Sequence, residues 1–149
     1  MVYKIKSGLF LIILFFLAGC QSDISSIPDM PVHLERNINT YKLESSGSYL
    51  YIPKPIIAME ATGFGGILIV HAWDDNYYAF DLACPVEADR NVRVGKPNLN
   101  LICKCDSCGE EYDLSMGLGS RIKNNPKKQG LRRYTVSLDS YSNNLLVTR

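Results

Sequence analysis

The feature that most constrains this chain is a pair of sulfur-bearing segments embedded in a sequence of short apolar runs. Four cysteines occupy the two segments, about 20 residues apart: Cys84 in the first, and Cys103, Cys105 and Cys108 in the second. The chain's two histidines, His33 and His71, lie upstream of both segments and are expected to be ordinary strand residues. Two such loops could close on one metal ion or cluster, or could be joined by a disulfide.

The first 19 residues are typical of an export signal. Lys4 and Lys6 give a basic start, an apolar run covers residues 9–18, and Leu17-Ala18-Gly19-Cys20 follows. This pattern resembles a bacterial lipoprotein signal, which implies cleavage before Cys20 and lipid on its thiol. The apolar run is about half of the roughly 20 residues that cross a bilayer as a helix, so a transmembrane anchor is disfavoured. We therefore expect a protein that is lipid-anchored in the bacterial cell envelope, at the outer membrane.

We expect the chain to divide into a signal peptide (1–19), a lipidated cysteine with a flexible tether (20–30) and one domain (31–149). The tether is rich in serine and aspartate and has no periodic apolar pattern. Cleavage leaves about 130 residues, which suit a single domain. It removes two of the 16 basic side chains and none of the 15 acidic ones, so the net charge falls from +1 to about −1. Such a balance gives no support for a nucleic-acid partner.

From Pro31 onward, short alternating, β-branched and aromatic runs are broken by Gly, Asn, Asp and Pro. This texture predicts strands and turns, and no segment has a long amphipathic helical pattern. The expected strands cover residues 32–37, 48–52, 56–61, 67–73, 77–81, 101–104, 131–138 and 144–148. Asp74-Asp75-Asn76 is expected to form a hairpin turn, because Asp and Asn side chains satisfy turn backbone groups. The sequence therefore predicts an all-β chain.

The cysteine segments and the residues that follow them carry a family resemblance. Cys84-Pro85-Val86 follows one expected strand, and Cys105-Asp106-Ser107-Cys108-Gly109 is followed by Tyr112-Asp113. Downstream come three further matching stretches: Gly117-Leu118-Gly119, Asn125-Pro126 and Leu131-Arg132-Arg133-Tyr134-Thr135-Val136. From about Gly66 onward the chain resembles a Rieske iron–sulfur domain, which has C-x-H in one loop and C-x-x-H-G-x-x-(Phe/Tyr)-Asp in a second. The resemblance implies antiparallel base sheets with an inserted two-loop subdomain at about 84–119.

The departures from the family pattern fall on its metal ligands. Where the family has its two histidines, this chain has Val86 and Cys108. Histidine ligands raise the reduction potential of a Rieske cluster, and valine cannot bind a metal. The resemblance therefore implies where a site would lie, but not a standard Rieske centre.

Several occupants of that site stay open. Cys103, two positions before Cys105 on an extended segment, is expected on the same face and could supply a fourth sulfur. The four cysteines could then hold zinc or an all-cysteine 2Fe–2S cluster. The signal has isolated lysines rather than an Arg-Arg pair, so an unfolded exported chain would have to acquire a cluster outside the cell. Zinc, or no metal, fits that route better.

A disulfide is the other expectation, because exported thiols tend to pair. Cys84 could join Cys105 or Cys108, and closing this loop would stabilise the fold by about 3 kcal/mol in the chain-entropy model. A redox-active C-x-x-C is disfavoured, because acidic neighbours at Asp106, Glu110 and Glu111 would raise a thiol pKa.

The expected function is that of a non-catalytic structural or interaction module with a diverged cluster site. No Ser-His-Asp, paired-carboxylate or phosphate-loop arrangement appears in the sequence. The alternative is an electron-transfer protein with an all-cysteine cluster. Its expected partners are the membrane, through the lipid, and an envelope redox or assembly protein.

Overall fold

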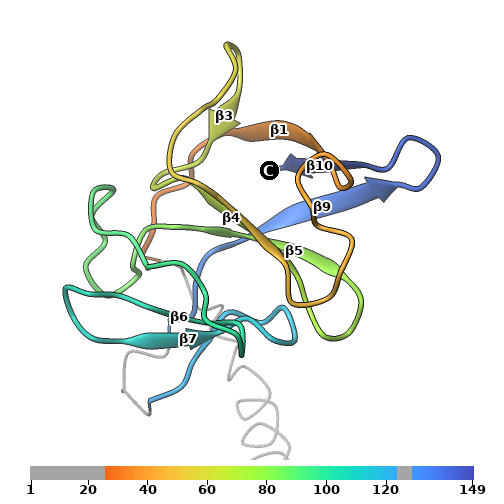
Figure 1. The fold of residues 1–149 in the computed structure, drawn as a ribbon. Helices are drawn as coiled ribbons and strands as arrows, with labels where there is room; N and C mark the ends of the chain where they lie inside the picture. Colours follow the sequence, from red (N-terminus) through yellow and green to blue (C-terminus); the bar gives the residue numbers. More distant parts are fainter. Residues whose placement is uncertain (1–25, 124–128) are drawn as a thin grey trace, which may run out of the picture.

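The computed structural model of the protein describes residues 26–123 and 129–149, which form ten β-strands (Figure 1). Seven strands make one sheet in the order β2-β4-β5-β9-β10-β1-β3, and three make a second sheet in the order β6-β7-β8. All strand pairs are antiparallel. The described residues include no α-helix, and so none that is long and apolar enough to cross a membrane. The expected all-β class is confirmed.

The large sheet consists of β1 (Val32–Asn37), β2 (Tyr49–Ile52), β3 (Ala61–Thr62), β4 (Ile67–His71), β5 (Tyr77–Asp81), β9 (Arg133–Asp139) and β10 (Asn144–Thr148). The small sheet consists of β6 (Ile102–Lys104), β7 (Glu111–Asp113) and β8 (Ser120–Arg121). It lies largely within the segment at about 84–119 where the family resemblance implies a two-loop subdomain, and its last strand ends at Arg121.

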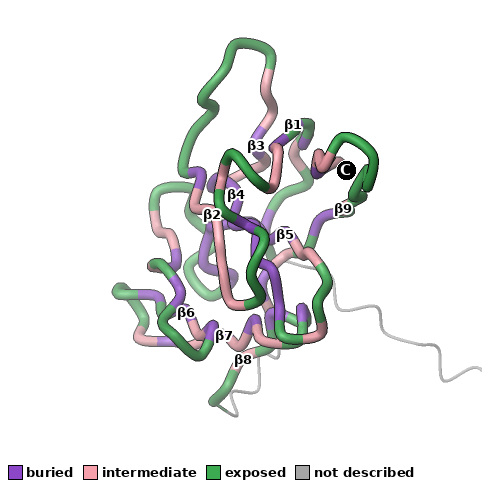
Figure 2. The backbone as a smooth tube through the Cα atoms, turned by 45° about the vertical axis from the view of Figure 1, so that its right-hand side comes forward, coloured by how far each residue is buried: buried purple, intermediate pink, exposed green. Residues whose placement is uncertain are grey.

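Strands β4 and β5 join the two parts of the molecule because they are buried on both faces. Ile67 and Ile69 face an apolar cluster inside the large sheet, whereas Leu68, Val70 and Phe80 face a second cluster beneath the small sheet. In Figure 2, β4 and the second half of β5 are purple. Alternate side chains of one strand pair thus hold the subdomain on the base.

Several expected strands match closely, and one is wrong. The hairpin at residues 74–76 is confirmed: the Ala72 amide donates to the Asn76 carbonyl at 2.9 Å, and Asp75 has a φ of +63°. The strand expected at 56–61 is instead an exposed loop, visible as the projecting green loop before β3 in Figure 2. The Glu60 carboxylate accepts the backbone amides of Ile56 and Ile57 there, so neither amide is available to a neighbouring strand.

The chain enters the domain beside the first cysteine loop. The Ser26 hydroxyl donates to the Pro85 carbonyl at 2.5 Å, and Ile27 is only 1% exposed. Arg132 donates to the Ile27 carbonyl, also at 2.5 Å. The last residues of the expected tether therefore pack on the domain. The expected signal peptide and Cys20 lie outside the described residues, as does Asn125-Pro126.

Candidate metal centre

The first cysteine loop follows β5, and the buried side chain of Asp81 at the end of that strand holds the start of the loop. The side chain of Asp81 accepts four hydrogen bonds of 2.6–2.9 Å, from the backbone amides of Phe64, Gly65 and Ala83 and from the hydroxyl of Tyr134. Hydrogen bonds to a charged group are among the stronger ones in proteins. They fix the direction of the chain one residue before Cys84.

Both loops make the same turn after their leading cysteine. The Cys84 carbonyl accepts the Ala88 amide at 2.9 Å, and the Cys105 carbonyl accepts the Gly109 amide at 2.8 Å. The last residue of each turn has a positive φ, +52° at Ala88 and +71° at Gly109. Glycine adopts this conformation without steric cost, whereas alanine does not.

These turns direct backbone amides at the sulfur atoms. The amides of Val86 and Glu87 donate to the Cys84 sulfur, and those of Ser107 and Cys108 donate to the Cys105 sulfur. The two donors come from the second and third residues after the cysteine in each case. Such donors stabilise a thiolate, which is the form that binds a metal.

The two loops converge, as expected from the sequence. The sulfur atoms of Cys84, Cys105 and Cys108 all lie within 4.8 Å of one another, and Sγ of Cys84 is 3.6 Å from Sγ of Cys108. Cys84 and Cys105 are buried, whereas Cys108 is exposed. All four described cysteines are free thiols. Three thiols so arranged could bind a metal ion, while the expected disulfide stays a prediction.

The thiols differ in how readily they ionise. Burial raises the pKa of Cys84, but hydrogen bonds from the Tyr112 hydroxyl, 3.4 Å away, and from the loop amides outweigh it, so that the pKa lies below its usual value. Burial raises the pKa of Cys105 to about 12. Cys84 therefore ionises more readily than Cys105, which would be deprotonated by a bound metal.

Cys103 is placed differently from the other three. It is fully buried in the apolar cluster beneath the small sheet, and burial raises its pKa to about 12. The group of mutually close sulfur atoms does not include it. Val86, at the position of a family histidine, is 39% exposed and offers no donor atom.

The histidines also lie in the large sheet, as expected. In His71, Nδ1 is 2.9 Å from the Leu43 carbonyl and Nε2 is 3.0 Å from the Asp75 carboxylate. His33 pairs with Thr148 across β1 and β10. Neither belongs to the group of close sulfur atoms.

A buried ion pair joins the end of the second cysteine loop to strand β8. Glu110, just before β7, pairs with Arg121 on β8. This pairing raises the pKa of Arg121, and Tyr112 and Cys108 add to the effect. Tyr112 and Arg121 were not expected at the sulfur group. Tyr112 was matched only to the aromatic position of the family motif.

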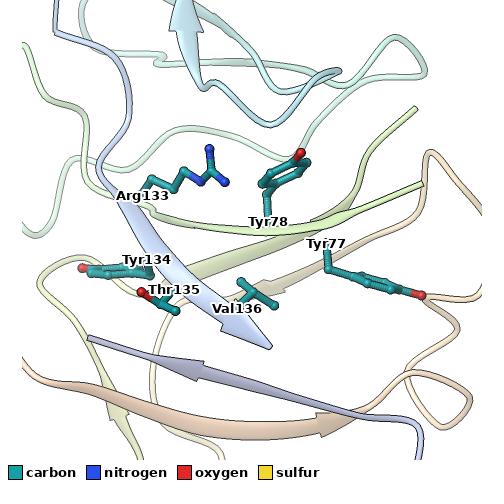
Figure 3. Close-up of a pocket in the computed structure, with 6 residues that line it drawn as sticks. All are labelled: Tyr77, Tyr78, Arg133, Tyr134, Thr135 and Val136. Atoms are coloured by element: carbon teal, nitrogen blue, oxygen red, sulfur yellow. The ribbon is translucent and has the colours of Figure 1, made fainter. Parts of the chain in front are cut away.

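A separate cavity of about 400 Å³ lies where β5 and β9 diverge (Figure 3). Its lining consists of Tyr77, Tyr78, Arg133, Tyr134, Thr135 and Val136. The Arg133 guanidinium lies over the Tyr78 ring, 4.5 Å from its centre. No cysteine lines this cavity.

Comparison with known proteins gives a distant structural likeness. No protein-family model matches the chain, and no curated protein matches its sequence. A solved structure that is similar to it is a proposed NADH-dependent nitrite reductase small subunit from Mycobacterium tuberculosis. The TM-score is 0.46 at 12% identity, over 81% of this chain and 97% of that chain. Such a distant likeness identifies no activity, which must be argued from this chain's own residues.

Proposed function

We propose that the protein is a non-catalytic metal-binding module that holds a single thiophilic ion, in the first instance Zn²⁺, between Cys84, Cys105 and Cys108. The observation that carries the proposal is the mutual approach of the three sulfur atoms within 4.8 Å. A tetrahedral ion with Zn–S bonds of about 2.3 Å separates its sulfur ligands by roughly 3.8 Å. The 3.6 Å between Cys84 and Cys108 is close to this separation.

The donor chemistry supports the same conclusion. Thiolates are soft ligands that favour zinc and copper(I) over magnesium or calcium. The loop amides and the Tyr112 hydroxyl surround the sulfur of Cys84 with hydrogen-bond donors, an outer shell of the kind that orients metal ligands. A bound ion would supply positive charge to three thiolates that otherwise repel one another.

The sulfur geometry favours one ion over a two-iron cluster. A 2Fe–2S cluster takes four protein ligands, two on each iron. Here three sulfur atoms surround one point, Cys103 stands outside the group, and Val86 cannot be a ligand. The electron-carrier alternative therefore lacks a fourth ligand among the described residues.

The fourth coordination position of a single ion would face outward. Cys108 and Val86 are both exposed, so water or a donor atom from a partner could reach an ion there. Structural zinc sites are usually closed by four protein ligands, whereas sites with three keep an exchangeable position. The proposed module would therefore bind its ion reversibly and could complete the site with a residue of an envelope partner.

Anchoring to the envelope is part of the proposal and rests on the sequence around Cys20. Ser26, the first described residue, contacts Pro85 in the first cysteine loop. Only five residues separate Ser26 from Cys20. A lipid on Cys20 would hold the metal site close to the membrane surface.

Metal analysis of the purified full-length protein tests the proposal. We expect about one zinc per chain, loss of zinc in Cys108→Ser and retention in Cys103→Ala. Cys108 is exposed, so its substitution leaves the core intact, and Cys103→Ala is the matched control because that thiol lies outside the sulfur group. Iron with labile sulfide and a paramagnetic signal on reduction would establish the cluster instead. Protein that takes up no zinc when metal is supplied would refute the proposed function.

A further inference from the structure

Two thiols from different loops lie in contact and differ in exposure. Cys108 is exposed, whereas Cys84, whose sulfur lies 3.6 Å from that of Cys108, is buried. A disulfide bond is about 2.05 Å long, so the two atoms need to approach by only about 1.5 Å to form one. This pair crosses between the loops, unlike the C-x-x-C pair of Cys105 and Cys108 that the sequence suggests.

We propose that the metal-free site performs thiol–disulfide exchange, with Cys108 as the attacking thiol, Cys84 as the resolving thiol, and exposed disulfides of small peptides as the substrate class. This activity goes beyond metal binding and does not require it. Only the statement that a bound ion blocks the exchange rests on the proposed function.

The reaction balances without a further oxidant. The Cys108 thiolate attacks one sulfur of the substrate disulfide, forms a mixed disulfide, and releases one substrate thiolate, which takes up the proton that Cys108 lost. The Cys84 thiolate then attacks Sγ of Cys108, so the mixed disulfide breaks, and the second substrate thiolate leaves and takes up the proton that Cys84 lost. The net result is one Cys84–Cys108 disulfide and two reduced substrate thiols.

The arrangement of the two sulfur atoms suits both steps. Access decides which thiol reacts first, and Cys108 is the exposed one of the three close thiols. In the second step the leaving thiolate departs on the side of Cys108 opposite to the attacking sulfur. Since Cys84 is buried and Cys108 is exposed, we expect that side to face solvent.

The other two thiols are less suited to resolve the mixed disulfide. Cys105 is also buried but lies in the same turn as Cys108, so a link between them would have to form inside the turn that the Gly109 amide closes onto the Cys105 carbonyl. Cys103 lies outside the group of close sulfur atoms. The contact of Cys84 with Cys108 across the two loops therefore favours this pair among the four described cysteines.

A bound ion and the disulfide would exclude each other, because both use the sulfur atoms of Cys84 and Cys108. Zinc occupies the thiolate electron pairs that would attack a disulfide. Oxidation removes two of the three metal ligands at once. Zinc would therefore protect the pair, and oxidation would release zinc.

Oxidised glutathione is the probe that tests the exchange. Full-length Cys20→Ala protein, which keeps only the four described cysteines, is reduced, treated with chelator and mixed with the probe. We expect about two glutathione thiols released per chain and a Cys84–Cys108 link in peptide mass spectra without reductant. Release should fall at least tenfold in Cys108→Ser and stay unchanged in Cys103→Ala. In Cys84→Ser we expect one equivalent released and glutathione retained on Cys108.

Three results would overturn the exchange: a Cys105–Cys108 link, a stable glutathione adduct on Cys108 of the parent protein, or no release of glutathione. The Cys108→Ser comparison keeps the test valid if Cys84→Ser fails to fold. A parallel sample with one equivalent of zinc should react at least tenfold more slowly. An unchanged rate with zinc would refute the block and, with it, metal binding at these thiols, but would leave the exchange standing.

Discussion

Tyr134 on β9 donates a hydrogen bond of 2.6 Å from its hydroxyl to the buried carboxylate of Asp81 at the end of β5. The same carboxylate accepts the amide of Ala83 at 2.7 Å, one residue before Cys84. A residue 50 positions further along the chain thus helps to fix where the first cysteine loop begins. The base sheet and the sulfur group are coupled through this carboxylate.

Replacing Tyr134 with Phe tests that coupling. The variant removes one hydrogen bond to a buried charged group and keeps the ring, so we expect it to lower the free energy of unfolding by about 1.5–3 kcal/mol. Urea denaturation measures the change. Tyr141→Phe is the matched control, because Tyr141 is 98% exposed and its loss should have no effect. Equal stability of Tyr134→Phe and the parent would contradict the coupling.

Gly63→Ala should also disturb the carboxylate of Asp81. Gly63 has a φ of +69°, and an added Cβ would meet the Tyr134 hydroxyl and lie 2.9 Å from Oδ2 of Asp81. We expect a loss of about 1–3 kcal/mol from backbone strain and crowding. In the Tyr134→Phe background one of the two clashes is gone, so the losses should be less than additive, by at least about 0.5 kcal/mol. Strict additivity in denaturation experiments would show that the two residues act independently.

The Arg36–Glu60 pair should make stability depend on pH. A hydrogen bond from Arg36, with the amides of Ile56 and Ile57 adding to it, lowers the pKa of Glu60 from its usual 4.5 to about 2. Because the folded state binds this proton less readily, the contribution is present above about pH 4.5 and is lost as the pH falls toward 2. We expect Glu60→Gln to cost about 3 kcal/mol at neutral pH, since it leaves a buried arginine without its counter-charge.

Denaturation of the parent and of Glu60→Gln across that range measures the effect. The difference between the two proteins should shrink as the pH falls. Glu44→Gln is a control in the loop between β1 and β2, because Glu44 is exposed and no ion pair holds it among the described residues. A difference that stays constant down to pH 2 would mean that Glu60 does not carry the dependence.

The Arg36–Glu60 pair also explains why the strand expected at residues 56–61 is absent. Ile56 and Ile57 are β-branched, and such residues locally favour a strand. Their amides instead bind Glu60, which Arg36 holds from 24 residues away in the sequence. Local propensity cannot report a tertiary contact of this kind. The turn at residues 74–76 could be predicted, because its own side chains make its hydrogen bonds.

The cysteine site also has features that the local sequence predicts and others that depend on tertiary packing. The approach of the two loops follows from spacing and from turn chemistry that each loop carries locally, including the glycine at 109. Cys103 and Cys105 are buried in the same cluster, but only Cys105 belongs to the group of mutually close sulfur atoms. Strand β6 ends at Lys104, and Cys105 instead forms an isolated bridge with Val94. The contact of Tyr112 with Cys84 depends on how the small sheet packs on the base, which spacing does not encode.

That contact supports the last prediction, which concerns metal affinity. The Tyr112 hydroxyl is 3.4 Å from Sγ of Cys84 and helps to keep the pKa of that thiol below its usual value. Tyr112→Phe removes this donor from the outer shell of the proposed site and keeps the buried ring. We expect zinc affinity to fall by about tenfold, since loss of such a donor typically weakens metal binding by ten- to a hundredfold.

Competition with a chromophoric chelator at constant pH measures this affinity in the full-length protein. Tyr77→Phe is the control, because it also removes a tyrosine hydroxyl that donates a hydrogen bond, but to the Leu43 carbonyl and not to sulfur. More protons should be released on zinc binding in Tyr112→Phe than in the parent, because a larger share of Cys84 would start as thiol. An unchanged affinity, together with unchanged proton release, would mean that the Tyr112 hydroxyl does not support the thiolate form of Cys84.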